Sequence, residues 1–158
     1  PVMQAYQQDR GAYFATPPVN LIYALDVSLG HILDEGMEAR FARHQLMGHS
    51  FRDAMQALGL EIIARPGLEA PTVTATYYPA GVDGALLPKV AEQGVTIAGG
   101  VLPSLAGKYF RVGHMGTCTP GDLIATIGAI ERGLTAMGAR VSPGAGVAAA
   151  EKALSRPA

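Results

Sequence analysis

The spacing of apolar residues changes near Gly59, and this change constrains the fold more than any other feature of the chain. Before Gly59, apolar residues recur at helical spacing, which predicts helices from Thr16 to Leu33 and from Met37 to Leu58. Charged residues of the second helix, Arg52 among them, are predicted to lie mostly on its opposite face. The two apolar stripes consist of Leu21, Leu25, Leu29, Ile32, Met37, Phe41, Phe51, Met55 and Leu58.

After Gly59, short runs of β-branched and aromatic residues replace the helical pattern. These runs predict four strands, at residues 60–63, 72–78, 95–98 and 109–114. Further helices are predicted at 83–93 and 119–137, with a weak one at 147–154, while residues 1–15 are predicted to be irregular. The sequence therefore predicts an α+β fold with helices packed on a small four-stranded sheet.

Two segments carry signals for the start of a helix. In Thr16-Pro17-Pro18 the hydroxyl is predicted to cap the helix, and proline is tolerated in a first turn. In Thr119-Pro120-Gly121-Asp122 a capping hydroxyl precedes an acid by three residues, which is typical of a capping box.

A single arginine lies in an apolar strand that glycines delimit, and Arg111 is accordingly the main candidate for binding a ligand. It lies between Phe110 and Val112, so its guanidinium is predicted to occupy a partly dry place. The natural ligand of such a group is a carboxylate, which arginine binds through two parallel hydrogen bonds. On the residues alone, a structural ion pair with an interior acid such as Asp122 is the other interpretation.

Composition excludes several classes of function. The 158 residues carry a net charge of −1, which provides no electrostatic footprint for nucleic acid. No apolar run reaches the length of a membrane span, and the N-terminus does not resemble a signal peptide. The single cysteine, Cys118, favours a reducing, cytoplasmic location, and its place before a helix predicts a lowered pKa. A hydrophobic content of 49% suggests a buried interface in addition to the core.

Other motifs in the chain are not expected to form sites. His44 and His49 are five residues apart and do not share a helix face, so no metal site is predicted. His44 is interpreted as a core or interface histidine, whereas His114 could shape a pocket or simply pack. The run 144–149 resembles a dinucleotide fingerprint but leaves no room for the required βαβ unit. Gly99-Gly100 predicts a tight turn or a close backbone approach.

Five motifs recur in an order that resembles the C-terminal part of class V aminotransferases of the alanine–glyoxylate and serine–pyruvate type. The likeness covers residues 10–137. The motifs are Tyr13-Phe14-Ala15-Thr16-Pro17-Pro18, the helix end Leu58-Gly59-Leu60, Pro71-Thr72-Val73-Thr74, Gly99-Gly100 and the Arg111 segment 108–116.

The resemblance implies the small C-terminal domain of a fold type I, pyridoxal-phosphate-dependent transferase, which works as a homodimer. Residues 1–33 would end the large cofactor domain, and residues 34–158 would form the small domain. In this family the residue matching Arg111 binds the substrate carboxylate. The residues matching Tyr13 and Thr16 contact the cofactor phosphate of the partner subunit.

The family's cofactor-binding lysine lies before the matched region, and the chain has only Lys89, Lys108 and Lys152. The resemblance thus implies amino transfer between a small amino acid and a 2-oxo acid such as glyoxylate or pyruvate, with this chain alone inactive. The alternative is a non-catalytic α+β domain that binds a carboxylate metabolite or serves as an assembly partner. In the family the large domain covers this surface, so in the isolated chain Phe14, Val19 and Ile22 should be exposed.

Overall fold

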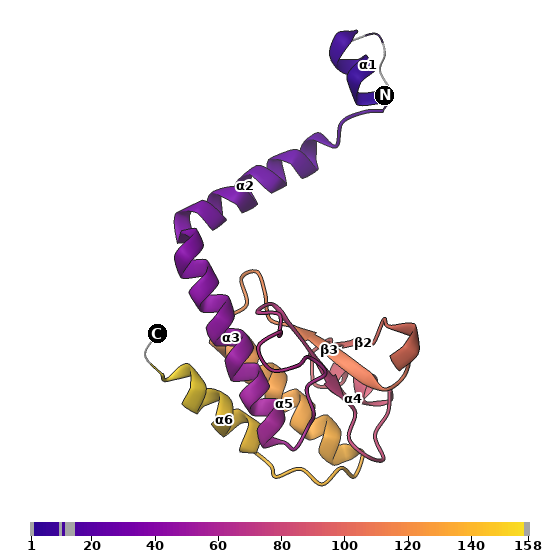
Figure 1. Cartoon of the computed structure of the whole chain (residues 1–158), viewed down its shortest axis with the longest axis vertical. Coiled ribbons are helices and arrows are strands. Elements are labelled where there is room, and N and C mark those ends of the chain that lie inside the picture. Colours follow the sequence, from indigo (N-terminus) through magenta and orange to yellow (C-terminus); the bar gives the residue numbers. More distant parts are fainter. Residues whose placement is uncertain (1, 10, 12–14, 157–158) are drawn as a thin grey trace. The chain divides into compact units, whose positions relative to one another are not determined.

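The computed structural model describes residues 2–9, 11 and 15–156 of the chain. They fall into two compact units, one ending at Arg40 and the other beginning at Phe41 (Figure 1). The division lies within a continuous helix, α3, which spans Met37–Ala57.

The first unit is helical and contains α1 (Val2–Gln8), α2 (Val19–Glu35) and the first turn of α3. The prediction that residues 1–15 are irregular is wrong at residues 2–8, which form α1. The predicted cap is also wrong: Pro18 holds the N-cap position, and no side chain caps the helix. A residue that precedes proline is disfavoured in helical geometry, so Thr16 stays outside the helix and α2 begins only after the second proline.

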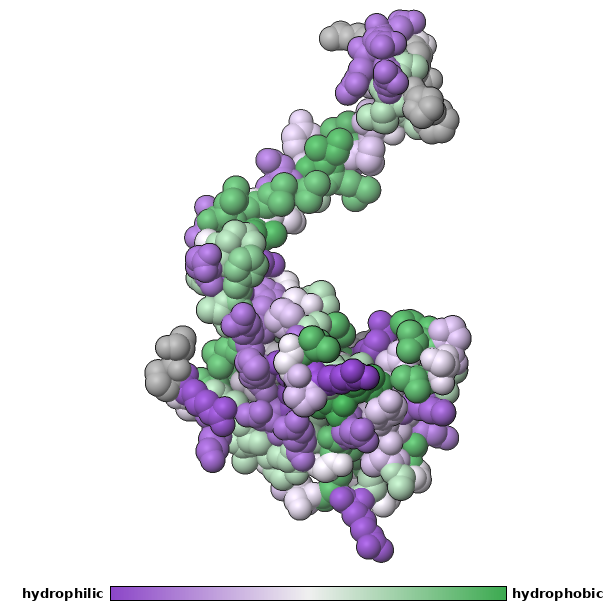
Figure 2. All heavy atoms as spheres, viewed as in Figure 1, coloured by the Kyte–Doolittle hydropathy of each residue, from purple (hydrophilic) through white to green (hydrophobic). Residues whose placement is uncertain are grey.

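Helix α2 leaves its apolar side chains exposed. None of its residues is buried, and Figure 2 shows apolar residues along its length. Val19 and Ile22 are about half exposed, as predicted, and Phe14 lies outside the described residues. The large exposed apolar side chains of α2 are Val19, Leu21, Ile22, Tyr23, Leu25, Val27, Leu29 and Leu33.

The second unit contains an antiparallel sheet of three strands and not the four predicted. Its order is β1 (Val73–Tyr77), β3 (Tyr109–Gly113), β2 (Ala98–Gly99). The predicted strand at 60–63 contributes a single bridge, Ile62 to Thr76, because Pro66 and Gly67 (φ +85°) then turn the chain away from β1. The predicted strand at 95–98 pairs only at its last residue.

Four helices share one buried core with β3 of the sheet. They are α3, α4 (Leu86–Ala91), α5 (Pro120–Ala136) and α6 (Ala145–Leu154), and a short 3₁₀ turn, η1 (Pro103–Leu105), precedes β3. α5 packs against both α4 and α6. The largest fully buried side chains are Phe51, Phe110, Met47, Met55, Leu86, Leu123, Ile127, Ile130 and Leu134.

Local signals account for most of these helix ends. Thr119 and Asp122 form the predicted capping box of α5. Gly59 has φ +74°, and the Leu60 amide donates to the Met55 carbonyl at 2.9 Å, which closes the end of α3. Arg52 departs from prediction, because it is only 7% exposed and donates to the Ala70 carbonyl and to His49 Nδ1.

A buried carboxylate caps α6. Glu131 of α5 accepts hydrogen bonds from the amides of Gly144 (2.9 Å), Gly146 (2.8 Å) and Val147 (3.2 Å). These amides have no intrahelical acceptor, and the helix dipole favours a negative charge beside them. Gly144 adopts φ +79°, and a Cβ at Gly146 would lie 2.9 Å from Glu131 Oε1. The glycines of the run 144–149, which resembles a dinucleotide fingerprint, thus bind the Glu131 carboxylate of the same chain.

Candidate functional site

Arg111 lies at the centre of the sheet, on the face opposite the helical core. It is in the middle strand, β3, where its Cα partners are Ala75 of β1 and Ala98 of β2. Neighbours on the same strand, Phe110 and Val112, are buried in the core, so Arg111 points away from it.

The Arg111 side chain is half-buried and held at one nitrogen. Its Nε donates to the Gly99 carbonyl at 2.9 Å. Within the described part of the chain, no acceptor is hydrogen-bonded to either terminal nitrogen of this guanidinium. The predicted alternative of an ion pair with Asp122 is wrong, because Asp122 accepts from the Thr119 amide (2.8 Å) and hydroxyl (2.7 Å) instead.

The segment that supplies the Gly99 carbonyl is itself attached to β3. The Gly100 amide donates to the Tyr109 carbonyl at 3.1 Å. The amides of Val101 and Leu102 both donate to the Tyr109 hydroxyl oxygen, each at 3.1 Å. A Cβ at Gly100 would lie 2.3 Å from the Tyr109 ring, so the predicted close backbone approach is present, and its partner is an aromatic ring.

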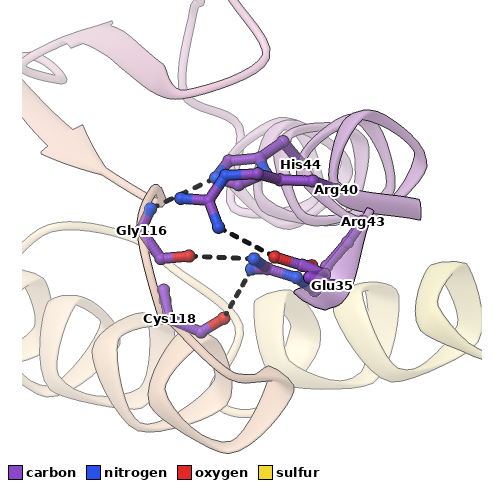
Figure 3. Close-up of polar contacts among 6 residues, drawn as sticks. All are labelled: Glu35, Arg40, Arg43, His44, Gly116 and Cys118. Atoms are coloured by element: carbon purple, nitrogen blue, oxygen red, sulfur yellow. Dashed lines mark hydrogen bonds and ion pairs between the residues drawn. The ribbon is translucent and has the colours of Figure 1, made fainter. Parts of the chain in front are cut away.

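The turn that follows β3 is held by two side chains from α3. Arg43 donates to the carbonyls of Gly116 (2.9 Å) and Cys118 (3.4 Å). His44 accepts the Gly116 amide at 3.1 Å through Nε2 (Figure 3). His44 is buried, as predicted. The sequence does not predict this contact of Arg43, because the carbonyls that it binds are 73 and 75 residues away along the chain.

His114, next to the Arg111 segment, lies in the core and not in a pocket. Its Nε2 is 2.9 Å from the Thr74 hydroxyl, and its ring packs against Phe51 with centroids 5.8 Å apart. Burial, with the charge of Arg52 adding to it, lowers the pKa of His114 to about 4. A neutral imidazole in this place fits the packing interpretation.

Cys118 and the histidines form no reactive or metal centre. The prediction of a lowered pKa for Cys118 is wrong: partial burial raises its pKa, with the charge of Asp122 adding to the effect. Over residues 2–9, 11 and 15–156, no three His, Cys, Asp or Glu side chains are grouped closely enough to hold a metal ion.

The remaining predicted contacts belong to the first unit. Thr16 is exposed and lines a surface depression of about 540 Å³ formed by residues 16–21, at the N-terminus of α2. Tyr13 lies outside the described residues. In the described part of the chain, no helix is long and apolar enough to cross a membrane.

No family model matches the chain, but similar proteins of known sequence include several aminotransferases. The chain is 39% identical over 153 residues to the serine–glyoxylate aminotransferase of Methylorubrum extorquens, covering 96% of the chain and 38% of that protein. It is 35% identical over 151 residues to an uncharacterized aminotransferase of Methanocaldococcus jannaschii, covering 94% and 39%.

Solved structures agree with these relatives. The ureidoglycine–glyoxylate aminotransferase of Bacillus subtilis superimposes with a TM-score of 0.88 at 28% identity, covering 98% of this chain and 40% of that one. The pyridoxamine–pyruvate aminotransferase of Mesorhizobium loti gives 0.83 at 37% identity, covering 89% and 36%. The chain therefore spans about two fifths of the length of the relatives it matches.

Proposed function

Homologues of this chain are class V aminotransferases, and we propose that it is the C-terminal portion of such an enzyme, dependent on pyridoxal phosphate. The reaction moves an amino group between a small amino acid of the alanine or serine type and a 2-oxo acid of the glyoxylate or pyruvate type. Relatives named for serine–glyoxylate, alanine–glyoxylate and pyridoxamine–pyruvate transfer support that substrate class. The lone cysteine supports a cytoplasmic location.

The observation that carries the proposal is the state of Arg111. Its Nε is fixed by the Gly99 carbonyl, and its terminal nitrogens have no hydrogen-bond acceptor among the described residues. A half-buried guanidinium presented in this way matches the two oxygens of a substrate carboxylate. Arg111 then binds and orients the substrate, and it takes no part in moving protons.

The first unit is proposed to contact the cofactor phosphate of a partner subunit through Tyr13 and Thr16. Thr16 is exposed beside the N-terminus of α2, where the helix dipole favours an anion. Pyridoxal phosphate, when bound, supplies the electron sink for amino transfer. The chain's own part is to hold the phosphate and the substrate carboxylate, which agrees with a homodimeric enzyme.

The lysine that carries the cofactor is proposed to come from outside this chain. Lys89 is engaged with Glu92 at 2.9 Å, and Lys152 is on the exposed side of α6. Lys108 lies one residue before β3, in a depression that Glu61 also lines. Treating the chain with pyridoxal phosphate and borohydride should leave these lysines unlabelled at stoichiometric level. Specific labelling of one of them would contradict this part of the proposal.

The decisive experiment is substitution of Arg111 in the product of the complete reading frame. Loss of one partner of a desolvated charge pair costs about 2–5 kcal/mol, so Arg111→Ala should lower kcat/KM with alanine or serine about 30- to 5,000-fold. Arg140→Ala is the matched control, because Arg140 is exposed and makes no described side-chain hydrogen bond. Equal activity of the Arg111 and Arg140 variants would refute the proposal.

The rival function is a non-catalytic domain that binds a carboxylate metabolite or another protein. The two differ in what the gene encodes before this segment, because an aminotransferase requires a lysine-bearing cofactor domain there. The exposed apolar side chains of α2 favour either function that covers them, a cofactor domain or another protein, over a domain that binds only a metabolite.

A further inference from the structure

Four hydrogen bonds connect β3 with the last residue of β2 and the three residues that follow it. Besides the bond from Arg111 Nε to the Gly99 carbonyl, the Gly100 amide donates to the Tyr109 carbonyl. The amides of Val101 and Leu102 converge on the Tyr109 hydroxyl oxygen. The Tyr109 side chain therefore holds the backbone next to Gly99, and the Gly99 carbonyl is the acceptor for the Arg111 side chain.

We propose that Tyr109 is a positioning residue for Arg111, acting through the Gly99 carbonyl. Tyr109 and Arg111 are two residues apart on β3, so their side chains leave the same face of the sheet. The inference rests on the proposed function, because a fixed guanidinium direction matters only where a carboxylate is to be bound at both terminal nitrogens.

The geometry of the hydroxyl explains why tyrosine suits this position. A phenolic oxygen has two lone pairs, and here both adjacent amides donate to it. The ring of Tyr109 is buried and lies where a side chain at residue 100 would be, so the backbone of Gly100 approaches it closely. The hydroxyl thus holds the amides of Val101 and Leu102, while the main-chain carbonyl of Tyr109 holds the amide of Gly100.

The size of the effect is limited by exposure. The side chains of Val101 and Leu102 are 68% and 51% exposed, so water can reach this segment when the hydroxyl is removed. Tyr109→Phe leaves the bond from the Gly100 amide to the Tyr109 main-chain carbonyl in place, so it loosens the Gly99 carbonyl and does not release it. A net hydrogen bond corresponds to about a two- to tenfold change in an equilibrium. That range is the expected effect on the Arg111–Gly99 contact.

The test uses the 158-residue chain and the ¹⁵Nε–H resonance of Arg111, which is assigned by its loss in Arg111→Lys. Tyr109→Phe should shift this resonance and accelerate its hydrogen exchange about two- to tenfold. Tyr77→Phe is the matched control, because Tyr77 is the cross-strand partner of Tyr109 and makes no described hydroxyl hydrogen bond. Backbone amides of α5 report whether the fold is intact.

Each outcome decides the inference. An Arg111 Nε–H signal that responds to Tyr109→Phe and not to Tyr77→Phe, with α5 unchanged, supports it, and an equal response to both variants overturns it. If Tyr109→Phe does not fold, the parent chain still decides, since the amides of Val101 and Leu102 must then exchange as slowly as those of β3. Rapid exchange there overturns the inference.

A pyruvate titration of the same resonance separates this inference from the proposed function. If the proposed function and this inference both hold, pyruvate shifts the Arg111 signal and the uncharged analogue pyruvamide does not. Tyr109→Phe then weakens pyruvate binding about two- to tenfold. Absence of any pyruvate-dependent shift in the parent chain would count against carboxylate binding. The exchange experiment would still report on the link between Tyr109 and Arg111.

Discussion

Replacing Glu131 by glutamine tests whether α6 depends on a carboxylate supplied by α5. The carboxylate is 7% exposed and accepts three amide hydrogen bonds of 2.8–3.2 Å at the start of α6. Glutamine keeps the volume but replaces one oxygen by an NH₂ group, which faces an amide donor and leaves it unpaired. It also removes the charge that the helix dipole stabilises.

The expected loss follows from those contacts. A hydrogen bond to a charged group contributes about 1.5–3 kcal/mol, and the dipole interaction adds about 0.3–1 kcal/mol. Glu131→Gln should therefore lower the free energy of unfolding by about 2–4 kcal/mol, which corresponds to a fall in Tm of about 5–15 °C for a chain of this size. A helix of 10 residues has little stability of its own, so α6 should be the first element lost.

Urea titrations followed by far-ultraviolet circular dichroism measure this loss, because the chain contains no tryptophan. Glu151→Gln is the control: Glu151 is on α6 as well, but it is exposed and its side chain makes no described hydrogen bond. That substitution should change the free energy of unfolding by less than about 0.5 kcal/mol. A Glu131→Gln variant as stable as the control would mean that water, and not the carboxylate, satisfies the amides of α6.

Of three further predictions, two concern the second unit and one concerns α2 in the first unit. Gly146→Ala should destabilise by about 1–3 kcal/mol in the same titration, since its Cβ would lie 2.9 Å from Glu131 Oε1. His114 has a pKa of about 4 when folded and about 6.5 when unfolded, so the unfolded chain binds more protons between these values. Stability should fall by up to about 3 kcal/mol as pH drops through that window, and His114→Asn should flatten the pH dependence. Light scattering should show self-association of the parent chain through α2, and Leu25→Glu and Leu29→Glu should reduce it. A monomeric parent chain would contradict the inference that another domain covers the apolar side chains of α2.

Local signals were sufficient for most helices of the second unit. The capping box at Thr119 and the glycine after Leu58 act within a few residues, and both are where the sequence placed them. The strands were less predictable, because a strand is defined by its partner. The segment around Ile62 has strand-like residues, yet it makes one bridge because the chain turns away after it.

The polar interior was the least predictable part. Glu131 lies within the apolar stripe of α5, between Ile127 and Leu134, and a charge in that position signals a buried partner. Its partners are backbone amides that are 13 to 16 residues away, so no side-chain pattern identifies them. The prediction that Thr16 caps α2 is wrong for the opposite reason. Its local cap signal is present, but the two prolines that follow it shift the start of the helix.

Comparison of Glu131 with Arg111 supports the proposal that Arg111 binds a group from outside this chain. Both are charged groups held by the same framework, and each loses hydration where it lies. Glu131 recovers that loss through three amide donors of its own chain. Arg111 uses one nitrogen to fix its direction, and its terminal nitrogens have no hydrogen-bond acceptor in the described residues. Under the proposed function, a substrate carboxylate supplies the missing acceptors, because its two oxygens have the spacing that the guanidinium requires.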